Sequence, residues 1–261
     1  MAGDPVRGGQ TLGALDGPLD WDGSRAAAIA ATEDFSESVV LVRPDGSLEL
    51  LGTEGDQSPI GTQFVSFGSP TVARGGIVVP ALLASRLDAQ GLFLFRRGRA
   101  HVIVGPGSRA PGSGGKFFVD FQTVRRLGPG VTFVATLQGD NPSTELGVFS
   151  WEPHSAVRRL DARAHRQGFT LDGPIATGGR TLIALGHTDR EQGIFLLGRH
   201  RPRLLLRNGD ASPLGGSIEI RLDAALVTLQ DRAVFTATLG SGARSSEAIL
   251  AVGEDRSGGP P

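Results

Sequence analysis

The first group of side chains that could do chemistry is acidic, and it lies in polar segments between short apolar runs. Two carboxyl groups separated by about 5 to 9 Å are the requirement of most glycoside hydrolases. One hypothesis is therefore a glycan-active hydrolase whose acid, base or nucleophile comes from these segments. Its candidate residues are Asp34, Asp88, Asp140, His187 and Asp189.

The second group is basic, and arginine supplies nearly all of it, since Lys116 is the only lysine. A guanidinium fork matches the geometry of carboxylate and phosphate groups. This group predicts binding of an acidic polymer or partner rather than a reaction. Its candidate residues are Arg96, Arg97, Arg99, Arg125, Arg126, Arg199, Arg201 and Arg203.

The sequence lacks the residues that several other kinds of chemistry require. The 261 residues include no cysteine, which excludes disulfides, thiolate nucleophiles and cysteine-ligated zinc. The five histidines form no pair with metal-ligand spacing, and no Walker loop or nucleophile elbow occurs. The sequence therefore predicts no catalytic residue by motif, no metal and no cofactor.

The net charge and the hydropathy of the chain also limit the classes of partner that are expected. The net charge is −1, which does not favour nucleic acid as a partner. No run of about 18 apolar residues is present, so no membrane span is predicted. Residues 1–5 lack the basic and apolar regions of a signal peptide.

The elements that must position these groups recur along the chain. A turn with the sequence Gly-Asp-x-x-Pro or a variant of it returns five times, at intervals of roughly 50 residues. Its closing glycines are Gly8, Gly61, Gly114, Gly168 and Gly215. With 39 glycines and 16 prolines between bursts of Leu, Val, Ile and Phe, the composition indicates short strands joined by tight turns.

Each interval holds the same order of predicted strands. A short first segment, such as 64–67 or 117–121, precedes an apolar second strand, then a third strand and a short fourth strand. The second strands are predicted at 26–31, 77–83, 131–137, 181–185 and 233–239, and the third at 39–42, 91–95, 147–151, 193–197 and 248–252. Fourth strands are predicted at 48–51, 101–104, 157–160 and 203–206.

One segment sets local propensity against the repeat. Residues 25–32, Arg-Ala-Ala-Ala-Ile-Ala-Ala-Thr, favour a helix by intrinsic propensity. Their register in the repeat predicts a second strand, and we expect the strand.

A four-stranded unit of this size cannot bury both its faces alone, so a series of five favours closure into a ring. We predict an all-β, five-bladed β-propeller of four-stranded antiparallel repeats. A β-sandwich or barrel is the alternative. The predicted propeller domain is 1–253, with repeats at about 8–60, 61–113, 114–167, 168–214 and 215–253, and 254–261 is a flexible tail.

The last repeat ends after three strands, so the fifth blade is predicted to lack its outer strand. An uncovered strand edge is a liability for a β protein. The sequence thus predicts that the chain is part of a longer chain or assembly, or that a partner fills this position.

Alternate loops of an antiparallel blade emerge at opposite ends of the ring. The acidic candidates fall at one end and the arginine candidates at the other, which predicts an electrostatically polarised molecule. The alternative is that hairpin turns carry charge only for solubility.

The repeat resembles bacterial tandem-repeat proteins of the NxxGxxAF type, a choice-of-anchor group. The resemblance rests on Gly-Ile-Phe at 193–195, on Gly-Leu-Phe at 91–93, and on the Gly-Asp-Ala-Ser-Pro turn at 209–213. The name-giving asparagine is replaced in all five units, by Asp20, Val72, Arg126, Ala176 and Thr228. The resemblance implies a secreted or cell-surface bacterial protein, and it carries over no activity and no catalytic residue.

These observations favour a non-catalytic, extracellular binding or scaffold module that recognises a protein or an anionic polysaccharide. The alternative is a glycan-active hydrolase with carboxylates at the central channel. Aromatic platforms for sugars are few, because the chain has no tyrosine and two tryptophans.

Overall fold

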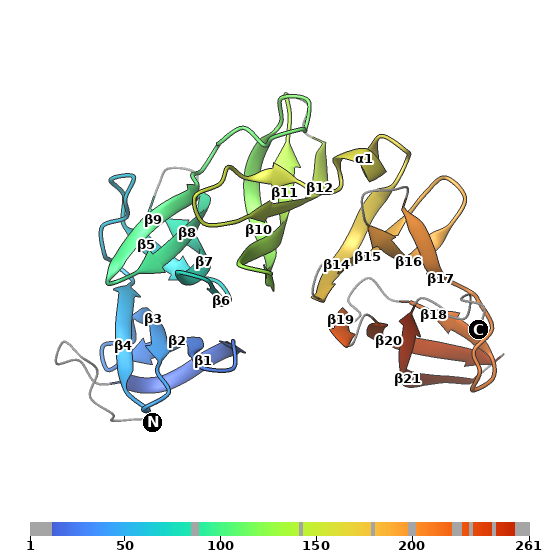
Figure 1. Ribbon diagram of the computed structural model, residues 1–261, viewed down its shortest axis with the longest axis horizontal. Helices are drawn as coiled ribbons and strands as arrows, with labels where there is room; N and C mark the ends of the chain where they lie inside the picture. The colour runs from blue at the N-terminus through green and yellow to red at the C-terminus, as the bar shows by residue number, and fades with distance from the viewer. Residues whose placement is uncertain are drawn as a thin grey trace, which may run out of the picture. The chain divides into compact units, whose positions relative to one another are not determined.

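The computed structural model of the chain is all-β (Figure 1). It describes residues 12–84, 89–140, 143–178, 181–197, 202–220, 226–229, 232–241 and 244–253. In these residues the one helix is α1, a single turn over Ala162–His165. The chain divides into two compact units, residues 1–159 and 160–261, which are described separately.

Unit 1 contains three antiparallel sheets that follow one another along the chain. The first sheet has the order β1-β2-β3-β4, the second β5-β7-β8-β9 with β6 also paired to β7, and the third β10-β11-β12-β13. The strand bounds are β1 Leu12–Trp21, β2 Ala26–Thr32, β3 Glu37–Val42, β4 Leu48–Thr53, β5 Phe64–Phe67, β6 Thr71–Ala73, β7 Gly76–Leu83, β8 Gln90–Arg96, β9 Arg99–Val104, β10 Phe117–Leu127, β11 Gly130–Gln138, β12 Thr144–Trp151 and β13 Arg158–Arg159.

Unit 2 contains two antiparallel sheets of the same kind. The fourth sheet has the order β14-β15-β16-β17. In the fifth sheet β20 lies between β21 on one side and β18 and β19 on the other. The strand bounds are β14 Thr170–Gly178, β15 Thr181–His187, β16 Gln192–Leu197, β17 Arg203–Arg207, β18 Ser217–Glu219, β19 Leu226–Leu229, β20 Arg232–Ser241 and β21 Arg244–Gly253.

The alanine-rich segment is a strand, as its place in the repeat predicts. It forms β2, which pairs with β1 on one side and with β3 on the other. Ala27, Ala28 and Ala30 are almost completely buried. Burial between two strands outweighs a helix preference of less than about 1 kcal/mol per residue.

The recurring Gly-x-Phe sequence has a steric explanation. In the second sheet the Phe93 ring lies back over Gly91, and a Cβ on Gly91 would come within 2.7 Å of that ring. The same arrangement holds in the third sheet, where a Cβ on Gly147 would lie 2.8 Å from the Phe149 ring. Glycine is required at both positions because it leaves room for the aromatic ring.

Each of these phenylalanines also contacts a ring at the start of its sheet. The centroids of Phe93 and Phe64 lie 5.1 Å apart, nearly perpendicular, and those of Phe149 and Phe118 lie 4.8 Å apart. In unit 2 Phe195 and Phe169 make the equivalent contact at 5.1 Å. Edge-to-face aromatic pairs add about 0.5–1.5 kcal/mol to what ring burial itself contributes.

The apolar cores of unit 1 lie between neighbouring sheets. One contains Ile29 and Val39 of the first sheet together with Phe64 and Phe93 of the second. A further core joins the second sheet to the third, and in unit 2 the fourth and fifth sheets share a core in the same way. Adjacent sheets within a unit are therefore held together by burial of their facing side chains.

The Gly-Asp-x-x-Pro turns at 55–64 and 209–218 form the same hydrogen bonds. Asp56 accepts a hydrogen bond from the Thr53 N–H at 2.7 Å, and Asp210 accepts one from the Arg207 N–H at 2.9 Å. The next strand then pairs back onto each turn: the Phe64 N–H donates to the Asp56 carbonyl oxygen, and the Ile218 N–H donates to the Asp210 carbonyl oxygen. The aspartate is thus a local cap that reverses the chain between two sheets.

The structure differs from the sequence prediction in three places. The first strand of the third sheet continues to Leu127 instead of ending at residue 121, because two bulges keep it paired to β11. The fourth strand predicted at 157–160 shortens to Arg158–Arg159. The degenerate turn that follows contains α1, whose Ala164 is buried.

No helix within the described residues is long and apolar enough to cross a membrane.

Candidate functional site: an arginine-lined pocket

A pocket of about 320 Å³ opens between the first and second sheets of unit 1. We call it the arginine pocket. Four arginines and one carboxylate line it above a mostly apolar floor. The lining residues are Arg25, Arg43, Arg96, Arg97 and Glu49, with Leu41, Leu51, Gly75, Gly76, Ile77 and Phe95 below them.

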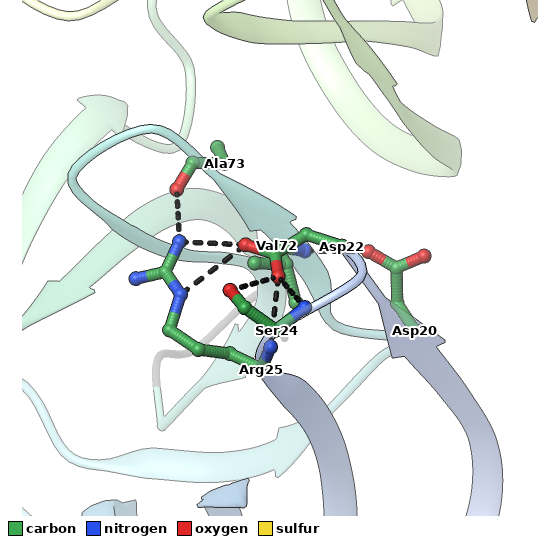
Figure 2. Close-up of polar contacts among 6 residues, drawn as sticks. All are labelled: Asp20, Asp22, Ser24, Arg25, Val72 and Ala73. Atoms are coloured by element: carbon green, nitrogen blue, oxygen red, sulfur yellow. Dashed lines mark hydrogen bonds and ion pairs between the residues drawn. The ribbon is translucent and has the colours of Figure 1, made fainter. Parts of the chain in front are cut away.

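The turn between β1 and β2 positions Arg25 (Figure 2). Asp22 Oδ1 accepts hydrogen bonds from the backbone N–H groups of Ser24, at 2.9 Å, and Arg25, at 2.8 Å. Its second oxygen receives the Arg25 guanidinium, with Nη2 at 2.9 Å and Nε at 3.2 Å. The same Nη2 donates to the Ala73 carbonyl in the second sheet at 3.4 Å. Arg25 is therefore held in place before any ligand arrives.

Burial alone would raise the pKa of Asp22. The hydrogen bonds from Arg25 and Ser24 outweigh that effect and hold the pKa of this carboxyl well below its usual range. Asp22 therefore stays ionised, and it keeps Arg25 oriented over the whole physiological pH range.

Asp20 makes a second connection between the same two sheets. Its carboxylate accepts a hydrogen bond from the Val72 N–H at 2.6 Å (Figure 2). Val72 is the middle residue of β6, and the loop that follows β6 forms one wall of the pocket. Asp20 and Asp22 thus fix that wall from the side of the first sheet.

Arg43 follows β3 and forms an ion pair with Glu49 of β4. The Glu49 carboxylate raises the pKa of Arg43, mainly through their hydrogen bond. About half of the Arg43 side chain remains exposed. Its guanidinium is oriented by Glu49 and still has donors free for a ligand.

Arg96 and Arg97 reach the pocket from the hairpin turn between β8 and β9. Arg97 has φ 52° and Gly98 has φ 67°, the left-handed pair typical of a two-residue hairpin turn. Arginine is unusual in this conformation, which costs about 1–2 kcal/mol for an ordinary side chain. Neither Arg96 nor Arg97 has an ion-pair partner among the residues that the structure describes.

Two glycines, Gly75 and Gly76, leave the opposite wall of the pocket without side chains. Gly75 has φ 104°, and a Cβ on Gly76 would lie 2.3 Å from the Phe95 carbonyl oxygen. A side chain would be strained by the backbone at Gly75 and would clash at Gly76, so this wall of the pocket is formed by backbone.

This arrangement can bind an anionic group. Arginines outnumber carboxylates in the lining four to one, and two of the four have no partner of their own in the described structure. Guanidinium groups bind carboxylate, sulfate and phosphate through paired hydrogen bonds. The lining contains no serine, histidine or second carboxylate that could act as nucleophile or base.

The other predicted arginines lie elsewhere. Arg99 lines a neighbouring pocket with Asp56, whereas Arg125 and Arg126 are exposed on β10 of the third sheet. Arg203 begins β17 in unit 2. Arg199 and Arg201 lie outside the described residues.

The sequence reasoning missed Arg25 and Arg43. Each follows a turn or strand end of the first sheet, at the same end as the β8–β9 turn of the second sheet. Strand order alone therefore contained a signal for them.

The predicted acidic group is divided among several sheets. Asp34 caps the turn after β2, where hydrogen bonds from Thr32 and Ser36 lower its pKa. Asp140 lines a pocket of the third sheet with Arg109 and Lys116.

The remaining acidic candidates belong to other parts of the chain. His187 Nδ1 lies 2.7 Å from the Asp172 carboxylate in the fourth sheet, and Asp189 follows His187 two residues later. Asp88 lies outside the described residues.

Metal ligands do not gather in the described part of the chain. No group of three or more His, Asp or Glu side chains that could hold a metal ion occurs there.

Comparison with known proteins gives one family and remote structural similarities. A model described as "Family of unknown function (DUF7453)" matches residues 22–167, which include the whole arginine pocket. No curated protein matches the chain.

Two solved structures are similar at low sequence identity. TolB from Acinetobacter baumannii has a TM-score of 0.47 at 9% identity, over 91% of this chain and 54% of that one. A puromycin hydrolase mutant complexed with PGG has a TM-score of 0.29 at 14% identity, over 92% and 54%. The chain spans about half the length of either protein.

Proposed function

The chain belongs to this family of unknown function, DUF7453, and we propose that it is a non-catalytic binding protein for an anionic polysaccharide. The observation that carries the proposal is the convergence of Arg25, Arg43, Arg96 and Arg97 on one pocket with a single carboxylate in its lining.

The two pairs of arginines have different tasks in this proposal. Arg25 and Arg43 are already oriented by Asp22 and Glu49, so they lose little conformational freedom when a ligand binds. Arg96 and Arg97 supply positive charge that no ion-pair partner among the described residues compensates. Together they attract an anion and then hold it in a defined orientation.

The size and floor of the pocket favour a charged sugar over a folded acidic surface. A volume of about 320 Å³ is at the small end of ligand pockets. One sugar ring can direct a carboxylate or sulfate to the guanidinium groups while its apolar face meets Leu41, the half-buried apolar side chain of the lining. A polymer presents many such charged rings to this one pocket.

We also propose that the five sheets are the blades of one five-bladed propeller, with a secreted or cell-surface location as its family resemblance implies. Within unit 1, neighbouring sheets are joined by a shared core and by side chain to backbone hydrogen bonds of one recurring kind. Small-angle scattering tests this, because a closed ring has a smaller maximum dimension than two separate units.

The binding proposal is tested by titrating the protein with a polyuronate and with a sulfated polysaccharide in calorimetry. We expect the affinity to fall as salt increases and to fall at least about tenfold in the double variant Arg96→Ser/Arg97→Ser. A neutral polysaccharide of similar length should not bind.

The matched control is Arg125→Ser/Arg158→Ser, which removes two exposed arginines of unit 1 that do not line the pocket. It should retain most of the affinity. Equal losses in both double variants would show diffuse attraction rather than a site, and binding of an acidic protein but neither polysaccharide would overturn the choice of ligand.

A further inference from the structure

The fifth sheet ends in a long strand that has a partner on one side only. β21 pairs with β20 over its whole length, from Arg244 opposite Ser241 to Gly253 opposite Arg232, without a bulge. Among the described residues β21 has no other strand partner.

The same position is covered in the other sheets. The third strand of the first, second and fourth sheets pairs on its outer side with β4, β9 and β17, respectively. In an antiparallel ladder alternate residues direct their N–H and C=O groups to that outer side. In β21 these groups face outward without a described partner.

The burial of side chains shows the consequence. Leu92 and Phe93 of β8 are completely buried, and Ile194 and Phe195 of β16 are almost so. The corresponding part of β21 is only partly buried at Ala248, Leu250 and Val252, although these residues pack against the core of unit 2. Ile249, on the other face, is 75% exposed.

The second half of β21 lacks the devices that normally protect an edge. Residues 248–252, Ala-Ile-Leu-Ala-Val, contain no charge and no proline. Natural sheets usually prevent edge pairing with lysine, proline, a bulge or a short strand. The charges of the ten-residue strand, Arg244 and Glu247, lie in its first four residues, so the edge over 248–252 is suited to pairing.

We propose that β21 is a docking edge for an extended strand of a partner polypeptide, which pairs antiparallel with it and completes the fifth sheet. Strand addition of this kind takes its affinity from main-chain hydrogen bonds and its specificity from alternate side chains.

The other sheets indicate the chemistry of the partner strand. Strands β4, β9 and β17 are five or six residues long and rich in aliphatic side chains. The chain segments outside the described residues at its two ends, 1–11 and 254–261, have a different composition, dominated by Gly, Pro and polar residues. A partner polypeptide with an aliphatic strand therefore fits the position better than either segment.

The test uses the 261-residue protein and a fluorescent peptide with the sequence of residues 47–53, Ser-Leu-Glu-Leu-Leu-Gly-Thr, which includes the whole of β4. Fluorescence anisotropy measures binding, and hydrogen exchange measures the protection of β21 amides. We expect saturable binding and new protection in β21 when the peptide is present. A peptide N-methylated at alternate residues should not bind, because it cannot form the ladder.

Two variants make the test specific to this edge. Ile249→Glu places a charge beside the docked strand and should weaken binding by about fivefold. Val227→Glu is the matched control, since Val227 is 55% exposed on β19 of the same sheet, on the other side of β20. It should bind the peptide as the unmodified protein does.

Three results would overturn the proposal. The first is protection of the outward β21 amides in the free monomer, since the edge would already be covered. The second is equal binding by the two variants, or no binding at millimolar peptide. The third is a homodimer that Ile249→Glu dissociates, which would make a second copy of the chain the occupant.

Discussion

The Glu37 carboxylate accepts a hydrogen bond from the backbone N–H of Phe67 at 2.9 Å and so joins the third strand of the first sheet to the first strand of the second. Gln90 makes the same connection from the second sheet to the Phe121 N–H of the third, at 3.1 Å. Phe121 borders a bulge of β10, and Phe67 lies one residue beyond a bulge of β5. A bulge interrupts the ladder, and an N–H freed there needs another partner.

This connection predicts a graded response at position 37. Glu37→Ala should lower the free energy of unfolding by about 1–3 kcal/mol, because it leaves the Phe67 N–H without its acceptor. Glu37→Gln should recover most of the loss, since Gln90 shows that an amide oxygen can accept a hydrogen bond at the equivalent place. Urea unfolding measures both variants. If both variants lowered the free energy of unfolding equally, the charge of Glu37 and not the hydrogen bond that it accepts would be responsible.

The aromatic ring over Gly147 predicts a coupled pair of substitutions. Gly147→Ala should destabilise the protein by about 1–3 kcal/mol, because the added methyl group meets the Phe149 ring. In a Phe149→Leu background the same change should cost much less. Gly139→Ala is the control, since its nearest neighbour is the Lys116 side chain at 3.5 Å. A double-mutant cycle with no coupling would contradict this explanation of the Gly-x-Phe repeat.

The left-handed conformation of Arg97 predicts a conflict between stability and binding. Arg97→Asn should raise the free energy of unfolding by about 0.5–1 kcal/mol, because asparagine tolerates a φ of 52° better than arginine. The same variant should bind the anionic polysaccharide more weakly. Thermal unfolding and calorimetry measure the two effects. Arg96→Asn, which does not change a left-handed residue, should lose affinity without gaining stability.

The low pKa of Asp22 predicts an acid-sensitive contribution to unit 1. A carboxyl whose pKa is lowered by folding stabilises the protein above its unfolded-state pKa of about 3.9. That contribution disappears as the pH falls from there through the folded-state value. Asp22→Asn should therefore flatten the stability profile below about pH 4, and at pH 7 it should cost about 1 kcal/mol. An unchanged acid limb in urea unfolding between pH 2 and 5 would contradict it.

Most of the strands could be predicted because their pattern is local and recurs. The second and third strands expected in each repeat all form, within a few residues of the predicted bounds. Even the alanine-rich β2 follows the repeat, since the register of its neighbours determines which residues are buried. The short helix α1 was not predicted, because its segment keeps only a degenerate copy of the turn sequence.

Two of the four arginines of the arginine pocket could be predicted from the sequence. Arg96 and Arg97 stand out in the sequence as an arginine pair in a hairpin turn. Arg25 and Arg43 are single arginines of other turns, and only the order of the predicted strands places them at the same end of the sheets. Packing of the first sheet against the second brings the four together, and Asp22 and Glu49 determine how two of them point.

The sequence by itself determined the alternation of strands and turns, because strand pattern and turn chemistry depend on near neighbours in the chain. Only the tertiary structure decided which charges share a pocket, which N–H groups Glu37 and Gln90 reach, and that β21 is left half exposed. Those outcomes depend on contacts between sheets, where residues about 30 to 50 positions apart become neighbours.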